Sequence, residues 1–214
     1  MAIGKIHWLG HASFRIDGDS AVVYIDPWKI ARGPGADLVL VTHEHYDHCS
    51  PEDVAKVRGA KTIVVAPAPC VKALGKVAGK GTLRSLAAGE AMTEKGVRVR
   101  AVPAYNVDPS RKGFHPRDPK IPRVGYIIEV DGMIVYHTGD TDEIPEMEGL
   151  GPDVVLIPVG GTYTMGAEEA ARAAGRMGAK EAVPMHWGDI VGTRADAERF
   201  AGMFKGKTHI LEPE

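Results

Sequence analysis

The amino-acid sequence predicts an α/β fold, namely a four-layer αββα sandwich of two similar halves with mixed sheets. Short apolar runs typical of buried strands alternate with helix-like segments along the chain. One series of features also occurs twice: an Asp-Gly turn, a strand and a buried apolar strand. Asp17-Gly18, Val23-Tyr24 and residues 37–41 recur 114, 112 and 116 residues later as Asp131-Gly132, Val135-Tyr136 and residues 153–157. Two such halves, packed sheet against sheet with helices outside, give four layers; chance similarity between β-rich segments is the alternative interpretation.

Length and composition fit one globular domain that spans residues 1–214. With 44% hydrophobic and 25% charged residues, the chain has enough apolar material for a core. A net charge of −2 gives no general reason to expect nucleic acid or an anionic membrane as a partner. The two cysteines, Cys49 and Cys70, favour a reducing compartment, and residues 1–8 lack the apolar core of a signal peptide. No apolar run approaches the ~20 residues that span a bilayer, so we expect a cytoplasmic protein.

The first half is expected to contain six short strands and two helices. The strands are predicted at residues 3–9, 12–17, 21–25, 37–41, 62–65 and 82–86. Ser50, Pro51 and Asp53 suit the N-cap, the first and the third position of a helix over residues 51–57. A proline-flanked segment opens a second helix over residues 67–76.

The second half is expected to follow a similar order. Its strands are predicted at residues 97–102, 124–130, 133–137, 154–157 and 182–185, with an edge strand at 209–211. Asp131-Gly132 is a strong hairpin signal between two of these strands. Helices are predicted over residues 166–177, with Thr164 as the cap, and over residues 194–204. The Pro- and Gly-punctuated loop at residues 105–123 is long for a simple connection, which indicates a functional or a disordered segment.

A cluster of metal-binding residue types follows the strand at residues 37–41. Thr42-His43-Glu44-His45-Tyr46-Asp47-His48 places three histidines and an aspartate within six positions. Imidazole nitrogens and carboxylate oxygens suit zinc and related divalent ions, and such side chains are rarely buried unless they are paired or coordinated. His43, His45 and Asp47 share one phase of an extended segment, whereas His48 falls out of phase. Donors on both sides of the loop predict two adjacent metal positions; a polar, His-rich loop is the alternative.

Several further motifs extend this pattern along the chain. They are Trp8-Leu9-Gly10-His11-Ala12-Ser13-Phe14, Ile25-Asp26-Pro27, Tyr136-His137-Thr138-Gly139-Asp140-Thr141, Gly160-Gly161-Thr162-Tyr163-Thr164-Met165-Gly166 and Pro184-Met185-His186-Trp187. Together with the histidine cluster they resemble the metallo-β-lactamase superfamily, and within it the branch of uncharacterised metal-dependent hydrolases related to ascorbate-6-phosphate lactonase. The resemblance covers essentially the whole chain, and the motifs are specific in combination. It implies a metallo-β-lactamase-like fold.

The resemblance also implies two metal sites that share a bridging carboxylate. The donors would be His43 and His45 with a third donor for one ion, Asp47, His48 and His186 for the other, and Asp140 between the two. One or two zinc ions are expected, with Mn²⁺ or Fe²⁺ as alternatives. Water bound between the metals would become hydroxide near neutral pH and attack a carbonyl or phosphoryl centre.

One position departs from the family pattern. The third histidine of the first site usually stands in a context like Pro-Ala-Trp-His, whereas this chain reads Pro103-Ala104-Tyr105-Asn106. Asn106 offers an amide oxygen, a harder and weaker donor for zinc than imidazole. Either Asn106 or water fills the position, or His115 reaches it from the loop. We therefore expect fewer than two tightly bound zinc ions per chain.

Four further residues are candidates for supporting roles. Asp47, besides binding metal, is expected to orient the attacking nucleophile. His11 is expected either to contact the substrate or donate a proton, or to be a buried, hydrogen-bonded histidine. Asp26 either orients a ligand imidazole or is a turn aspartate. For His137 a supporting or core role is favoured over metal ligation.

A basic segment bears on the charge of the substrate. Residues 111–123 contain five basic residues and a single acidic one, Asp118: Arg111, Lys112, Arg117, Lys120 and Arg123. This loop either covers an anionic group such as a phosphate ester or is a solvated surface. A helix that starts near Gly166 would add backbone N–H donors for the same anion.

These patterns predict a metal-dependent hydrolase that attacks an ester, lactone or phosphoester bond of a small, anionic substrate. The alternatives are a phosphodiesterase or nuclease, and a non-catalytic metal- or ligand-binding protein on the same fold. Nucleic acid and membranes are not expected as partners, and a homo-oligomer is compatible with the sequence. Specificity resides in loops around a shared core, so the sequence does not name the substrate.

Overall fold

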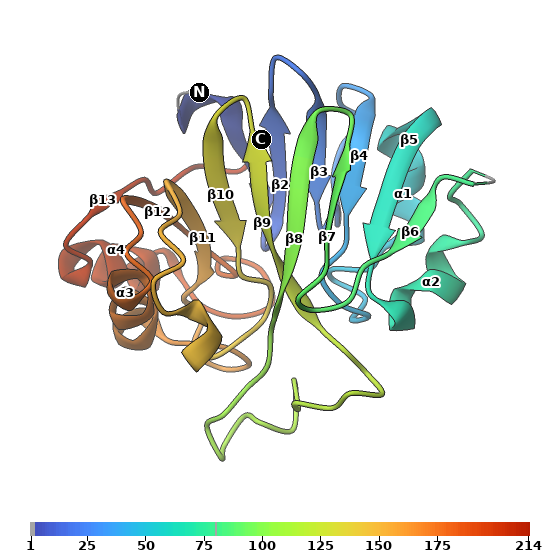
Figure 1. Cartoon of the computed structure of the whole chain (residues 1–214). Coiled ribbons are helices and arrows are strands. Elements are labelled where there is room, and N and C mark those ends of the chain that lie inside the picture. The colour runs from blue at the N-terminus through green and yellow to red at the C-terminus, as the bar shows by residue number, and fades with distance from the viewer. Residues whose placement is uncertain (1–2, 80) are drawn as a thin grey trace.

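Two mixed β-sheets pack face to face, and helices cover the outer face of each sheet (Figure 1). The computed structural model describes residues 3–79 and 81–214 of the chain. The arrangement is the predicted four-layer αββα sandwich, so the α/β fold class is confirmed. Within the described residues, no helix combines the length and the hydropathy that a membrane-spanning segment requires.

The first sheet has six strands in the order β1-β2-β3-β4-β5-β6. Their bounds are β1 Ile6–Gly10, β2 Ser13–Asp17, β3 Val22–Ile25, β4 Ala36–Leu40, β5 Arg58–Ala66 and β6 Leu83–Ser85. Strands β1, β2 and β3 alternate in direction, and β3 to β6 pair in parallel. Helices α1 (Pro51–Val57) and α2 (Ala68–Leu74) connect the parallel strands, and a short 3-10 helix, η1 (Ile3–Lys5), precedes β1.

The second sheet has seven strands in the order β13-β12-β11-β10-β9-β8-β7. Their bounds are β7 Ala91–Glu94, β8 Val97–Pro103, β9 Val124–Val130, β10 Met133–His137, β11 Val154–Pro158, β12 Glu181–Met185 and β13 Lys207–Thr208. Strands β10 to β13 are parallel, and β7, β8 and β9 alternate in direction. The connections are η2 (Pro145–Met147), α3 (Ala167–Arg176) and α4 (Arg194–Met203).

The two halves follow the same path, which supports the internal repeat. Strands β1 to β6 with α1 and α2 correspond in order and direction to β8 to β13 with α3 and α4. One matching detail is a carboxylate that accepts a hydrogen bond from the backbone of the preceding strand. Asp37 accepts a hydrogen bond from the Val22 N–H at 3.0 Å, and Asp153 accepts one from the Ile134 N–H at 2.8 Å.

Side-chain alternation along the strands divides the apolar residues between two cores. In β4, Leu38 and Leu40 face the second sheet and join the main core, whereas Val39 packs under the helices. Residues on β5 alternate in the same way, with Val65 in the main core and Val64 in the smaller one. A period of two is what a strand buried on both faces requires.

Four details of the sequence prediction were wrong. The first strand begins at Ile6 rather than at residue 3, because Ile3–Lys5 form the 3-10 helix η1. Strand β7 was not predicted, because its four residues, Ala91–Glu94, include none that is buried and show no clear apolar alternation. The last strand is Lys207–Thr208 rather than 209–211, and it pairs with only two residues of β12. Gly166, not Thr164, is the N-cap of α3, and Thr164 is buried instead.

Candidate metal centre

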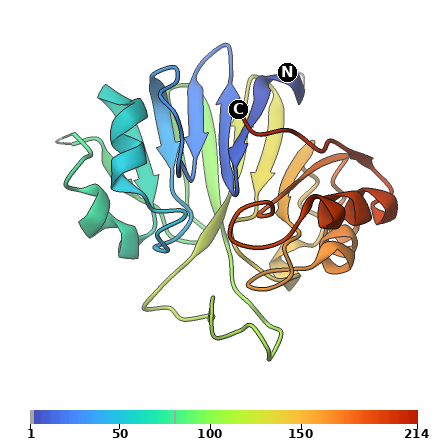
Figure 2. The same ribbon diagram turned by 180° about the vertical axis from the view of Figure 1, so that it is seen from behind.

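The predicted site residues lie beyond the carboxyl ends of strands that share one direction. His11 follows β1, Asp26 follows β3, His43 to His48 follow β4, Asn106 and His115 follow β8, Asp140 follows β10, and His186 follows β12. The loop of residues 105–123 extends below this same edge in both views of the molecule (Figures 1 and 2). The fold therefore gathers donors from both halves at one edge, as expected for α/β sheets.

Three histidine nitrogens converge to form the first group of donors. His43 Nε2 lies 3.2 Å from His45 Nδ1, and His115 Nε2 lies 3.2 Å from the same atom. Two nitrogens on a tetrahedral zinc ion, each ~2.0–2.1 Å from the metal, are separated by about 3.3 Å. The three imidazoles therefore fit one small divalent cation. Of the two candidates in the loop, it is His115 that the structure places beside His43 and His45.

The second group of donors lies next to the first. His48 Nε2 is 3.7 Å from Asp47 Oδ2, and His11 Nε2 is 3.0 Å from the same oxygen. His11, Asp47, His48 and His186 all place a candidate ligand atom within 4.8 Å of one another. Sequence reasoning did not include His11 among the donors, because a single histidine after a strand carries no spacing signal.

Asp140 lies between the two groups. Its Oδ2 is 3.1 Å from His186 Nε2 and 3.4 Å from His115 Nε2, and its Oδ1 is 3.4 Å from His48 Nε2. One carboxylate that contacts imidazoles of both groups has the position expected of a bridging ligand.

Several of these atoms are buried without a hydrogen-bond partner. Among the described residues they include His48 Nε2, His186 Nε2 and Asp140 Oδ1. A buried polar atom without a partner costs roughly 1–3 kcal/mol. Three such atoms at one point are satisfied together by a divalent cation, so the residues fit a metal.

Asp26 orients two candidate ligand imidazoles, His48 directly and His43 through Thr42. Its Oδ2 accepts a hydrogen bond from His48 Nδ1 at 2.7 Å and one from the Thr42 hydroxyl at 2.6 Å. The Thr42 oxygen in turn lies 3.0 Å from His43 Nδ1, whose proton it accepts because its own proton is donated to Asp26. Both imidazoles therefore keep a proton on Nδ1 and turn Nε2 towards the metal position. Thr42 was not singled out from sequence, since a threonine next to a histidine is too common to be a signal.

Electrostatics prepare the first group of donors for a cation. Burial holds the pKa of His43 well below its ordinary value and also lowers the pKa of His45. Burial lowers the pKa of His115 to about 4. These three imidazoles are therefore neutral at pH 7, which is the form that binds metal.

Asp140 and the carboxylate of the second group, Asp47, are ionised. Burial alone would raise the pKa of Asp140, but His186 and His48 outweigh it and hold the pKa well below the usual range. Burial likewise opposes ionisation of Asp47, yet the hydrogen bond from His11 and the charge of His48 lower its pKa to about 2. Two carboxylates are thus charged at neutral pH, ready to balance a cation.

Strained backbone conformations occur at the centre. Within the described residues, six non-glycine residues have a positive φ, and three of them, His11, Asp26 and His186, belong to this cluster. The His11 carbonyl accepts hydrogen bonds from the His186 N–H and from Trp8 Nε1, both at 2.9 Å. A Cβ on Gly160 would collide with the His186 carbonyl, which explains the glycine there. Such strain persists only where the surroundings enforce it, as at functional sites.

His137 supports the centre without belonging to it. Its Nε2 donates to the Ala12 carbonyl at 2.9 Å, and its Nδ1 accepts a hydrogen bond from the Gly139 N–H at 3.1 Å. Both ring nitrogens are therefore used within the protein. The side chain connects the end of β10 to the loop that carries His11, in line with a supporting role.

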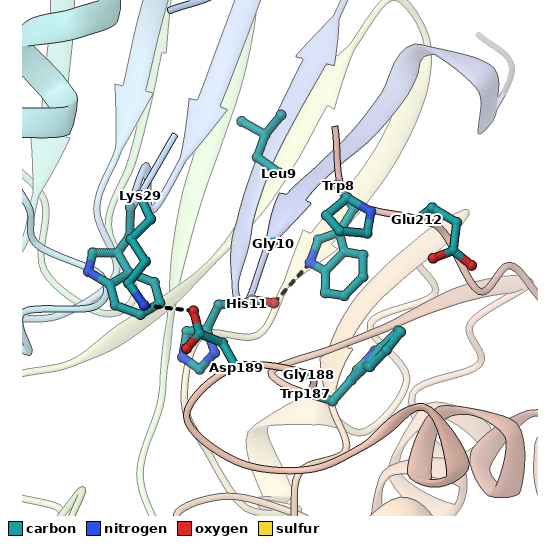
Figure 3. A pocket seen from close by; sticks show the side chains of 11 residues that line it. Trp8, Leu9, Gly10, His11, Lys29, Trp187, Gly188, Asp189 and Glu212 are labelled. Carbon is teal, nitrogen blue, oxygen red and sulfur yellow. Dashed lines mark hydrogen bonds and ion pairs between the residues drawn. The ribbon is translucent and has the colours of Figure 1, made fainter. Parts of the chain in front are cut away.

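Two cavities meet at this cluster. The first, of about 440 Å³, opens over His45, Asp47, His115, Asp140 and His186. The second, of about 410 Å³, lies on the other side of His11 and is lined by all three tryptophans, Trp8, Trp28 and Trp187 (Figure 3). An ion pair between Lys29 and Asp189, 2.8 Å long, crosses this second cavity (Figure 3). Only the first cavity exposes donors from both groups.

Asn106 connects two loops beside the first group of donors. Its side-chain nitrogen donates to the Arg111 carbonyl at 2.9 Å and to the Tyr163 carbonyl at 2.7 Å, and it lies 3.3 Å from His115 Nδ1. Its backbone N–H donates to the His115 carbonyl at 2.7 Å. Asn106 thus fixes the part of the loop that carries His115.

Three arginines of the basic loop are paired with carboxylates. Arg111 is buried and binds Asp142 and Glu169, Arg117 lies 3.1 Å from Glu146, and Arg123 pairs with Glu44. The first turn of α3 carries Glu168 and Glu169, so its N-terminus already faces negative charge. The partners of Arg111 are 31 and 58 residues away in the sequence, which is why pattern alone gave no sign of them.

Comparison with known proteins places this geometry in a family. The profile of a beta-lactamase superfamily domain matches residues 5–186. A UPF0173 metal-dependent hydrolase from Thermococcus onnurineus is 33% identical over 222 residues, which cover 97% of this chain and 95% of that protein. A UPF0173 metal-dependent hydrolase from Methanoculleus marisnigri is 36% identical over 217 residues, which cover 96% and 91%.

A solved structure agrees with these matches. The crystal structure of a candidate metal-dependent hydrolase from Parabacteroides distasonis has a TM-score of 0.83 and 34% identity, and the match covers 98% of this chain and 93% of that chain. The fold, the donor cluster and these similarities together show that the chain belongs to the UPF0173 metal-dependent hydrolases of the metallo-β-lactamase superfamily.

Proposed function

We propose that the protein hydrolyses an ester, lactone or phosphoester bond of a small molecule at two divalent metal ions. The observation that carries this proposal is the convergence of imidazole and carboxylate donors on both sides of Asp140, at the floor of an open cavity. The first ion would be held by His43, His45 and His115, and the second by Asp47, His48 and His186, with Asp140 between them. A nitrogen-rich donor set favours zinc, and Mn²⁺ and Fe²⁺ are the alternatives.

The two sites are not expected to bind metal equally well. Ligation through His115 Nε2 places the imidazole proton on Nδ1, which faces the Asn106 amide nitrogen at 3.3 Å. Two donors that face each other repel, whereas His48 has the Asp26 carboxylate at the corresponding position. The first site is therefore the weaker one, which keeps the expectation of fewer than two tightly bound zinc ions per chain.

The metal ions would supply the acidity that lets water act as a nucleophile near neutral pH and would polarise the bond under attack. The chain supplies the surroundings of that reaction. Asp47, ionised and open to the cavity, orients the attacking water. His11 touches Asp47 and is the candidate proton donor to the leaving oxygen. The position of His11 supports this role. Its pKa does not, because burial lowers the pKa of His11 despite the contact with Asp47.

Reconstitution of the purified protein with zinc or manganese tests the proposal. A panel of γ-lactones, 4-nitrophenyl esters and bis(4-nitrophenyl) phosphate covers the three bond types. We expect turnover of at least one class, loss of turnover with a chelator and in His48→Ala, and normal turnover in His7→Ala, whose side chain binds Asp17 and Glu214 at the surface. Tight binding of a panel member without turnover would instead indicate a non-catalytic binding protein.

A further inference from the structure

The walls of the metal cavity are apolar and aromatic. Tyr46, Phe114, Tyr163 and Ile190 line it above the donors, and they come from four different loops. Phe114 and Tyr163 pack edge to face, with ring centroids 4.7 Å apart and planes at 79°. The mouth of the site is therefore built partly from aromatic side chains that hold each other in place.

Two of these side chains are unusually exposed for their type. Tyr46 is 68% exposed and Phe114 is 43% exposed. Isolated exposed apolar residues are ordinary, but an apolar group that rims a polar cavity is typical of a ligand-binding surface. Here both residues lie next to donors in the sequence, Tyr46 between His45 and Asp47, and Phe114 before His115.

The cavity offers no cationic side chain to a substrate. Its described lining contains neither lysine nor arginine, and its formal charges are the carboxylates of Glu44, Asp47 and Asp140. Glu44 is already paired with Arg123, and burial and two carboxylates hold Arg111 away from the cavity. An anionic group would meet carboxylates and aromatic rings there, apart from the metal ions. Burial of an anion without a partner is costly, whereas burial of apolar surface is favourable.

We propose that the substrate is an uncharged ester or lactone whose apolar alkyl or aryl group packs against Phe114, Tyr163, Tyr46 and Ile190. This inference rests on the function proposed above and narrows its substrate class. Water adds to the carbonyl carbon and the bond from that carbon to the ester oxygen breaks. An ester gives an alcohol and a carboxylate, a lactone gives one hydroxycarboxylate, and one proton is released in either case. The product is an anion in a cavity without cationic side chains, which favours its release.

A matched pair of probes separates charge from size. 4-Nitrophenyl butyrate and mono-4-nitrophenyl succinate present the same leaving group and an acyl chain of similar length, but only the second carries a carboxylate. We expect kcat/KM to be at least about tenfold higher for the butyrate and to rise along a series of γ-lactones as the alkyl tail lengthens, since each methylene in an apolar pocket contributes roughly tenfold or more. A preference for the succinate, or no dependence on tail length, would overturn the inference while leaving the hydrolase intact.

Variants in one loop provide the matched control. Phe114 and Ile121 belong to the same loop and are 43% and 39% exposed, but only Phe114 lines the metal cavity. Phe114→Ala and Ile190→Ala should lower kcat/KM for the butyrate by about tenfold and leave the succinate nearly unchanged, whereas Ile121→Ala should affect neither. Metal content is measured in each variant, because Phe114 precedes a proposed ligand. Equal effects of Phe114→Ala, Ile190→Ala and Ile121→Ala would contradict the assignment.

A binding measurement makes the test independent of turnover. The ketone 4-phenyl-2-butanone has the shape of benzyl acetate but no ester bond to hydrolyse. Calorimetric titration of the metal-loaded protein should show that the ketone binds. Its dissociation constant should rise about tenfold in Phe114→Ala, because the same apolar contact is lost. If no probe is turned over but the ketone binds in this manner, the hydrolase proposal fails and the apolar cavity stands. If every probe is turned over alike and the ketone does not bind, the hydrolase proposal stands and the proposed apolar substrate fails.

Discussion

His115 stands where three imidazoles meet, and its removal tests the composition of the first site. His115→Ala leaves His43 and His45 as the only imidazoles of that group, so we expect the weaker of two metal ions to be lost. Metal analysis after dialysis against a graded series of chelator concentrations measures this. His209→Ala is the control, because that ring contacts Glu181 instead. Identical metal content and affinity in both variants would leave Asn106 or water as the third donor.

Asp26 illustrates how a residue without metal contact can control affinity. Asp26→Asn replaces one carboxylate oxygen with an amide donor and removes the negative charge. The side chain then no longer satisfies His48 Nδ1, the Thr42 hydroxyl and the Thr42 N–H together, so the tautomers of His48 and, through Thr42, of His43 are less firmly fixed. We expect metal affinity to fall roughly 10- to 100-fold, as for other residues that orient ligand imidazoles. Competition with a chromogenic chelator gives the affinity. Asp37→Asn, which weakens only the hydrogen bond to the Val22 N–H, should leave it unchanged, and an equal loss there would point to general destabilisation.

At the scale of elements, Arg111 fastens the 105–123 loop to the rest of the molecule. Its guanidinium binds Glu169 of α3 and Asp142, and Asp142 also accepts hydrogen bonds from the N–H groups of Val107 and Asp108. Arg111→Met leaves two carboxylates without their partner, a change that costs about 3–5 kcal/mol when the pair is buried. We expect faster amide hydrogen exchange in residues 105–116 and weaker binding at the first metal site.

The neighbouring Arg117 supplies the comparison for this loop. Its side chain is mostly exposed, pairs with Glu146 and lies 4.8 Å from the centroid of the Tyr105 ring. Such exposed contacts contribute little to stability, so Arg117→Met should alter exchange by little. If both variants exchange at the rate of the unaltered protein, Arg111 does not hold the loop.

Helix α1 depends on a carboxylate at its start. Asp53 accepts hydrogen bonds from Ser50, from Lys56 and from the N–H groups of Lys29 and Ile30. Burial would raise the pKa of Asp53, but Lys56 and Ser50 outweigh it and lower the pKa. The folded pKa is thus below the unfolded value of about 3.9, so the stabilisation is present above pH 4 and is lost as the pH falls further. Urea unfolding should give Asp53→Asn a lower free energy of unfolding than the unaltered protein at pH 7, and this difference should shrink towards pH 3. A difference that does not change with pH would exclude the linkage.

At the scale of the whole molecule, metal should stabilise the fold by joining its halves. Donors come from the loop after β4 in the first half and from the loops after β8, β10 and β12 in the second, so bound metal favours the folded state over the unfolded chain. At 100 times the dissociation constant the gain is roughly 2.7 kcal/mol, which for a chain of this size raises Tm by roughly 5–10 °C. Thermal unfolding with and without a chelator measures the shift. If Tm does not change although metal analysis proves that the metal has been removed, the two halves pack together without metal.

The sequence predicted what depends on local pattern and missed what depends on distant partners. Apolar alternation and the Asp-Gly turns marked β2, β3, β9 and β10, and the spacing of His43 to His48 marked the donor loop. Strand β7 turns a single apolar side chain, Met92, towards the core, which is too little to reveal a strand. The choice between Asn106 and His115 depends on the path of a loop without periodicity, and the role of Arg111 depends on carboxylates in other elements. Long-range pairing of this kind leaves no trace in residue spacing.

The division of the donors between the halves has a consequence for synthesis of the chain. The first half emerges first and already carries His43, His45, Asp47 and His48. Without Asp140 and His186 these residues form an incomplete cluster that can capture an ion only loosely. The proposed two-metal centre would close only after β12 has been made and the sheets have docked. Full metal occupancy would therefore mark a chain whose two halves have both been made and have packed together. A chain whose synthesis stops midway would differ from a finished molecule because it fails to retain metal.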